Sequence, residues 1–170
     1  MKRMIALFFV LAMGPTSGLA AGDALVAETA VITVTDEGTP VVLLRYDTAG
    51  LTGHYIHNAV LEWVLPIMPV DRATEYAAYA VESRWTGALT DRDPLPVLGT
   101  KPLAVWDFTP KDRLRAGRSV IRLQVTGAVQ GWSNGDTNYG IAVVSRDFDR
   151  AAVKTLLSEA KLYVWNEILD

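Results

Sequence analysis

The 170-residue chain contains no cysteine and only two histidines. Without cysteine it forms no disulfide, holds no metal through thiolates and carries no lipid on a cleavage-site cysteine. The fold must therefore be held together by packing of its apolar residues, which make up 50% of the sequence. Basic residues are also scarce: 16 Lys and Arg stand against 19 Asp and Glu, and the formal net charge is −3. This acidic balance argues against nucleic acid as the partner.

Long apolar runs are absent except at the amino terminus. Lys2 and Arg3 precede an apolar run over residues 4–13, and small residues follow it. This order is typical of a secretory signal peptide, and the run is about half as long as the roughly 20 residues of a membrane span. We predict a signal peptide over residues 1–20 and one exported domain over residues 21–170, periplasmic or extracellular, without a membrane span. Cleavage removes two positive charges and no negative one, so the formal charge moves from −3 to −5.

Alternating and β-branched residues predict strands along most of the exported domain. The predicted segments are residues 31–35, 41–46, 55–65, 75–83, 103–108, 119–125, 141–145 and 161–165. The first two flank an acidic turn that contains Gly38, and we expect them to form a hairpin. In the third, Ala59, Leu61 and Trp63 recur at every second position and are expected to face the core. Residues 87–101 have the composition of a long loop.

Helical patterns are short and few. Thr126 is expected to cap a short helix, and a second helix is predicted over residues 152–160 behind a cap at Asp149. A single helical turn is predicted over residues 110–115. Strands without alternating βαβ units predict an all-β fold, an antiparallel jelly-roll-like β-sandwich with one or two short helices. The residues expected to lie between its two layers include Leu44, Leu61, Leu123 and Trp132.

Five segments in a fixed order resemble a known family. They are residues 42–46 (VLLRY), 56–65 (I-x-x-A-x-L-x-x-x-L), 79–85 (YAVESRW), 123–132 (LQVTGAVQGW) and 138–144 (NYGIAVV). Together they resemble the DNRLRE family, also called disaggregatase-related, which is similar to alginate-type carbohydrate-binding modules. The resemblance implies a jelly-roll β-sandwich in secreted or surface proteins, usually without catalytic activity. It also implies that some relatives bind polysaccharide.

Aromatic and basic residues near the ends of predicted strands form the candidate ligand site. Sugar rings stack their C–H faces on indole and phenol rings, and basic side chains pair with uronate carboxylates. The residues with these properties beside predicted loops are Arg84, Trp85, Lys101, Trp106, Arg113 and Tyr139. We predict that they frame a groove for an acidic glycan. The alternative interpretation is that tryptophans at strand ends cap the core.

The overall pattern predicts a secreted, non-enzymatic β-sandwich module that binds polysaccharide of an envelope or extracellular matrix. One alternative is a periplasmic or cell-surface structural protein that binds another protein through an exposed apolar patch or an unpaired strand edge. The second alternative is a small polysaccharide lyase or hydrolase. Its acids and bases would be Tyr55 with a histidine, or the aspartate pairs Asp91–Asp93 and Asp147–Asp149.

No metal site and no cofactor are predicted. His54 and His57 lie three positions apart at the start of a strand and are expected to point to opposite faces, which suits a shared metal poorly. A structural calcium bound by oxygen atoms in a turn stays open as an alternative. Its ligands would be Asp36 with Glu37, or Asp136 with Asn134.

Overall fold

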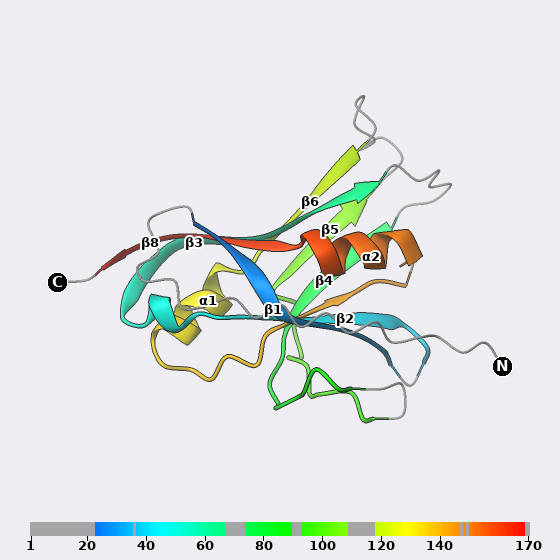
Figure 1. The fold of residues 1–170 in the computed structure, drawn as a ribbon, viewed down its shortest axis with the longest axis horizontal. Helices are drawn as coiled ribbons and strands as arrows, with labels where there is room; N and C mark the ends of the chain where they lie inside the picture. Colours follow the sequence, from blue (N-terminus) through cyan, green and yellow to red (C-terminus); the bar gives the residue numbers. More distant parts are fainter. Residues whose placement is uncertain are drawn as a thin grey trace.

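The computed structural model describes residues 23–35, 37–66, 74–89, 93–108, 118–146, 148 and 150–168. The strands are β1 (Asp23–Val34), β2 (Pro40–Tyr46), β3 (His54–Pro66), β4 (Thr74–Ala80), β5 (Ala104–Phe108), β6 (Arg118–Gln124), β7 (Ile141–Val144) and β8 (Lys161–Ile168). The helices are the 3-10 helix η1 (Ala49–Leu51), α1 (Thr126–Ser133) and α2 (Arg150–Glu159), as Figure 1 shows. Each predicted strand segment falls on one of these strands, and both predicted α-helices are present.

The described strands join into one antiparallel eight-stranded sheet in the order β5-β4-β7-β2-β1-β8-β3-β6. Residues 23–26 of β1 pair with β8, whereas residues 27–34 pair with β2. A first half of the sheet (β5, β4, β7 and β2) therefore meets a second half (β8, β3 and β6) at β1. The all-β prediction is confirmed. β1 begins at Asp23, earlier than predicted, because its amino-terminal part serves the second half.

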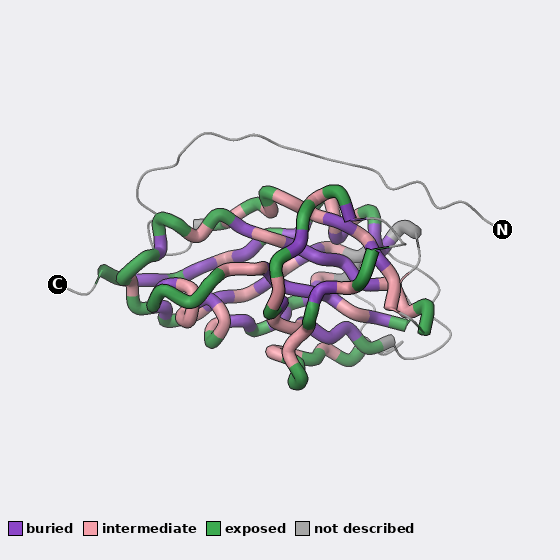
Figure 2. Tube along the Cα trace, turned by 90° about the horizontal axis from the view of Figure 1, so that it is seen from below, coloured by how far each residue is buried: buried purple, intermediate pink, exposed green. Residues whose placement is uncertain are grey.

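The main core lies on the inner face of both halves. It combines buried residues of β2, β3, β4, β6, β7 and β8 with those of the two α-helices. Leu44, Leu61 and Leu123 are at most 1% exposed, as predicted. Trp132 of α1, also expected between the layers, is only partly buried and packs against the main core. Figure 2 shows these buried stretches running through the middle of the molecule, with exposed stretches around them. Each such leucine contributes about 1.5–3 kcal/mol through its removal from water.

The first half is also buried on its outer face. β2 and β7 carry unbroken apolar runs, VVLL and IAVV, a pattern consistent with strands covered on both sides. The residues after β4 cross this face and bury a second apolar group, here called the outer cluster. The outer cluster comprises Val31, Val41, Leu43, Val81, Trp85, Leu89 and Ala142. In β8, by contrast, buried and exposed residues alternate, so the outer face of the second half is open.

The structure shows what Thr126 and Asn138, two polar residues of predicted motifs, bind. Thr126 does not cap α1: the N-cap is Val125, and the Thr126 hydroxyl accepts a hydrogen bond of 2.9 Å from the Ala59 N–H. The cap prediction is wrong because this hydroxyl serves the backbone of β3 where β6 ends. Asn138, from the motif before β7, donates a 2.8 Å hydrogen bond to the carbonyl of Tyr46 and so ties its loop to the end of β2. The predicted turn over residues 110–115 and the Asp149 cap lie outside the described residues.

Candidate functional site

Trp85 and Tyr139 are brought together, but inside the outer cluster. Trp85 is 4% exposed, and its indole N–H donates a 2.5 Å hydrogen bond to the Tyr139 carbonyl. The Arg45 guanidinium carbon lies 5.2 Å from the centre of the Trp85 ring, and its Nη2 donates to the Thr29 hydroxyl at 3.3 Å. A ring packed and covered in this way has no open face for a sugar. The interpretation of Trp85 as a cap on apolar residues is therefore the one that the structure supports.

Among the described residues, Trp106 lies apart from this pair, against the main core. Trp106 of β5 is half-buried against the main core, where its ring centre lies 6.4 Å from that of Tyr76. Arg84 and Lys101 are exposed on the segment that crosses the first half, and Arg113 lies outside the described residues. A role of these residues in ligand binding stays a prediction.

The open outer face of the second half carries aromatic side chains that the sequence analysis did not include in the candidate ligand site. Tyr163 and Trp165 are alternate residues of β8, with ring centres 6.3 Å apart and ring planes 28° apart. Trp165 is 38% exposed. On the neighbouring strand β3, Tyr55 is 47% exposed and meets His57 edge-on, with ring centres 4.9 Å apart. These four side chains are here called the aromatic face.

A β-bulge in β3 completes the aromatic face. The pairing between β3 and β8 shifts between Ile56 and Asn58, which leaves His57 as the extra residue. His57 Nε2 lies 3.3 Å from a carboxylate oxygen of Glu167, whereas His54 Nδ1 lies 2.6 Å from the amide oxygen of Asn166. Because these two partners are consecutive residues of β8, the histidines lie on opposite faces of the sheet. The prediction that they do not share one side is confirmed.

Carboxamides and paired charges border the aromatic face. Asn58 stands opposite Trp165 in the register, and its amide oxygen accepts a hydrogen bond from Gln124 of β6. The charges nearby include an ion pair in which Arg122 Nε lies 2.7 Å from Glu62. Aromatic rings beside amide groups offer both apolar contact and hydrogen bonds to a polar ring-shaped ligand.

Periodicity in β8 is the feature that would have identified this face. In KLYVWNEI, Leu162 and Val164 are buried in the main core, so the alternate residues Tyr163 and Trp165 must point outward. The sequence analysis ended this strand at Trp165 and compared only residues beside predicted loops. An aromatic pair in the middle of the last strand was therefore passed over.

Of the acid–base pairs named for the lyase or hydrolase alternative, the described part of the chain brings together Tyr55 and His57. Its His, Asp and Glu side chains form no group of three or more that could hold a metal ion. Asp36, one proposed calcium ligand, lies outside the described residues, as do Asp91, Asp147 and Asp149. Within the described ranges, neither α-helix has the length and hydrophobicity that crossing a bilayer requires.

Comparison of the chain with models of known protein families gives no match, and comparison with curated proteins gives none either. The resemblance to the DNRLRE family, carried by five sequence segments, stays a prediction.

Proposed function

We propose that this protein is a non-catalytic binding module for polysaccharide of a cell envelope or extracellular matrix. The observation that carries the proposal is the aromatic face, where Trp165 and Tyr163 lie side by side on an open sheet. Apolar residues usually turn inward, so large rings exposed next to each other need a reason. Stacking against the C–H faces of sugar rings would supply that reason.

The surroundings of Trp165 favour sugar over a purely apolar ligand. Asn58 and Gln124 bring carboxamide groups next to the rings, and these both donate and accept hydrogen bonds. The nearby Glu62 is paired with Arg122, and Glu167 lies 3.3 Å from the His57 imidazole. A ligand on this face therefore meets rings and amides, which are suited to a hydroxyl-bearing ring.

The sheet order supports the finer fold assignment within the proposal, a jelly-roll β-sandwich. The two halves run β2-β7-β4-β5 and β1-β8-β3-β6, and β5 contacts β6 at the far ends. This is the order obtained when a long antiparallel hairpin is wrapped into two layers of eight strands. In this arrangement the aromatic face is the outer surface of one layer.

Export through a cleaved signal peptide, to the periplasm or beyond, belongs to the same proposal. It rests on the basic, apolar and small residues of positions 1–20. A polysaccharide of the envelope or matrix is then within reach of the folded domain.

Binding is tested with the full chain on a panel of immobilised polysaccharides that includes alginate, with retention and new reducing ends both recorded. Trp165→Ala should weaken retention about tenfold, which corresponds to a loss of about 1.4 kcal/mol. Trp165→Phe should keep most of the binding, since it keeps a ring. The control is Val105→Ala, which alters a residue that is 48% exposed on β5. Retention by no polysaccharide, or equal retention by the wild type and Trp165→Ala, would contradict the proposal, and new reducing ends would indicate the hydrolase or lyase alternative.

Exposed aliphatic residues favour a second candidate, a structural protein that binds another protein. Val26 of β1 is 52% exposed, and Ile168 at the end of β8 is 69% exposed. The apolar area of these side chains, like that of the exposed aromatic rings, would suit contact with a protein partner. Absence of glycan binding, together with loss of a protein partner on Val26→Asp, would favour this candidate.

A further inference from the structure

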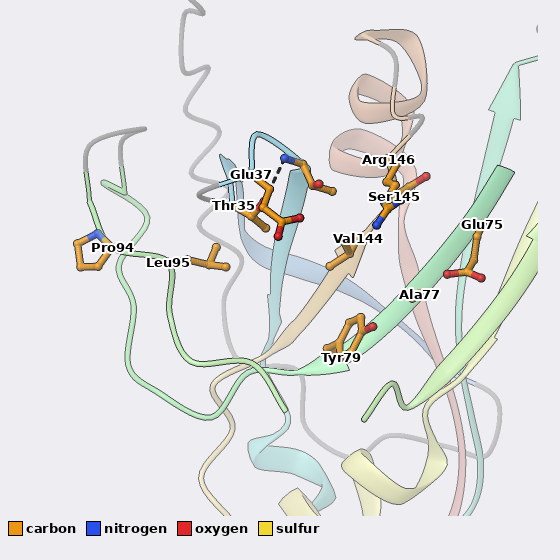
Figure 3. A pocket seen from close by; sticks show the side chains of 11 residues that line it. Thr35, Glu37, Glu75, Ala77, Tyr79, Pro94, Leu95, Val144, Ser145 and Arg146 are labelled. Atoms are coloured by element: carbon orange, nitrogen blue, oxygen red, sulfur yellow. Dashed lines mark hydrogen bonds between the residues drawn. The ribbon is translucent and has the colours of Figure 1, made fainter. Parts of the chain in front are cut away.

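A groove of about 920 Å³ opens on the outer face of the first half, on the other half of the sheet from the aromatic face. The segment after β4 covers the outer cluster but not the neighbouring parts of β4 and β7, and the groove lies over these uncovered parts. Figure 3 shows the turn between β1 and β2 on one side, Leu95 of the crossing segment on another, and Tyr79 rising from β4. Its volume falls within the range of sites that bind small ligands.

The floor of the groove is apolar and fixed by strand pairing. Ala77 stands directly opposite Val144 in the pairing of β4 with β7, and Tyr79, two residues further along β4, lies on the same face. Tyr79 packs in part against the outer cluster, which holds its ring in place. The groove therefore has one positioned aromatic ring at its base.

The walls carry charges and hydroxyl groups. Glu75 lies two residues before Ala77 on β4, and Glu37 extends from the β1–β2 turn on the opposite side of Val144 in Figure 3. Arg146 follows β7 and is the basic residue among the described lining residues. Hydroxyl groups come from Thr35, Thr39, Tyr79 and Ser145.

The turn that carries Glu37 is tied together internally. The Thr39 N–H donates to the Thr35 hydroxyl at 3.1 Å, the Thr35 N–H donates to the Thr39 carbonyl at 2.9 Å, and the Gly38 N–H donates to the Thr35 carbonyl at 2.8 Å. Gly38 has a φ of +79°, a conformation that glycine adopts without strain. A wall fixed in this way loses little conformational entropy when a ligand binds.

These groups favour one class of ligand. Among the described lining residues, two carboxylates stand against one guanidinium. This balance repels a polyanion such as a uronate chain, and the guanidinium weakens the attraction of the carboxylates for a simple cation. The hydroxyl groups of a sugar donate hydrogen bonds to carboxylates and accept them from a guanidinium, and a tyrosine ring packs against the sugar ring itself. We infer that the groove binds a short segment of a neutral glycan, with Glu75 and Glu37 accepting from its hydroxyl groups over Tyr79. This deepens the proposed function by naming a second site and its ligand class.

The test measures binding of the full chain to soluble hexasaccharides by calorimetry. The probes are neutral cello-, manno- and N-acetylchito-oligomers, an acidic oligomer of mannuronate and guluronate, and a cationic chitosan oligomer. The wild type should bind at least one neutral hexasaccharide and bind it more tightly than the acidic and cationic probes. Glu75→Ala should weaken that binding about tenfold, with Glu75→Gln in between because an amide still hydrogen-bonds. Glu159→Ala, which removes an exposed carboxylate from α2, is the matched control and should leave binding unchanged.

The outcomes separate the groove from the aromatic face. If Glu75→Ala binds the neutral hexasaccharides as the wild type does while Trp165→Ala loses polysaccharide retention, the groove inference fails and the proposed function stands. Tighter binding of the acidic or cationic probe than of every neutral one overturns the ligand class. If the wild type binds no soluble or immobilised glycan, both proposals fail. Unchanged urea midpoints for the variants ensure that a loss of binding does not reflect unfolding.

Discussion

The environment of Trp85 makes a quantitative prediction about the covered outer face. Truncating a buried tryptophan to alanine costs about 3–5 kcal/mol through lost packing and a residual cavity. The hydrogen bond to the Tyr139 carbonyl contributes about 1 kcal/mol, and the Arg45 guanidinium over the ring about 0.5–1 kcal/mol. Because these contributions overlap, we expect Trp85→Ala to lower the free energy of unfolding by about 4 kcal/mol.

Urea denaturation followed by circular dichroism measures this loss. Domains have unfolding free energies of about 5–15 kcal/mol, so a loss of this size moves the midpoint strongly. Trp85→Phe keeps most of the packing but removes the N–H donor, and it should cost about 1–2 kcal/mol. Trp165→Ala, on the open face, serves as the matched tryptophan control and should cost less than Trp85→Phe. If Trp85→Ala stays within about 0.5 kcal/mol of the wild type, the ring is not buried and the segment after β4 does not cover the first half.

Two further predictions concern backbone conformation and pH. Gly140 has a φ of +100° and a side chain there would meet the Leu44 carbonyl, so Gly140→Ala should cost about 1–3 kcal/mol. Gly127→Ala in α1 has open space and should instead stabilise by about 0.5–1 kcal/mol; a similar urea midpoint for both would contradict this. Burial raises the pKa of the Tyr46 hydroxyl above its usual 10, so the stability of the fold is unaffected by the ionisation of this group below about pH 10 and falls above it, where the unfolded tyrosine ionises while the buried one stays neutral. Tyr46→Phe should flatten the fall in stability between pH 10 and 11.5 by up to about 1.4 kcal/mol per pH unit, and an unchanged slope would show that Tyr46 is not buried in the neutral form.

Tyr46→Phe also tests a buried polar group at neutral pH. The Tyr46 hydroxyl has no hydrogen-bond partner among the described residues. An unsatisfied buried hydroxyl is costly, so replacing it with hydrogen should leave stability at pH 7 unchanged or raise it by about 1 kcal/mol. A clear loss of stability, measured by urea denaturation, would indicate a partner for this hydroxyl.

The strands were predictable because their patterns are local. Ala59, Leu61 and Trp63 are buried and alternate with residues that are only half-buried, and alternation of this kind indicates which side of a strand faces the core. The unbroken VVLL of β2 likewise reports burial on both faces. The same reasoning, applied to Tyr163 and Trp165, would have identified the aromatic face.

Alternation along a strand does not predict whether a residue beside a loop is exposed. Trp85 follows β4 in a segment without periodicity, and whether its ring is open depends on Arg45, Tyr139 and the course of the following chain. The groove likewise brings together residues of the β1–β2 turn, β4, β7 and the crossing segment. No spacing within any one of these segments indicates the others.

The sequence by itself therefore determined the compartment prediction, the all-β class, the positions of the strands and the inward side of most of them. Those properties depend on neighbouring residues, since side chains alternate along every strand whatever it pairs with. Tertiary structure alone decided that β1 is shared between the two halves, that a bulge turns His57 outward, that Trp85 is covered, and that Glu75 lines a groove on the outer face of the first half. Pairing between strands distant in the sequence sets these features, because burial at each site depends on which segment packs over it.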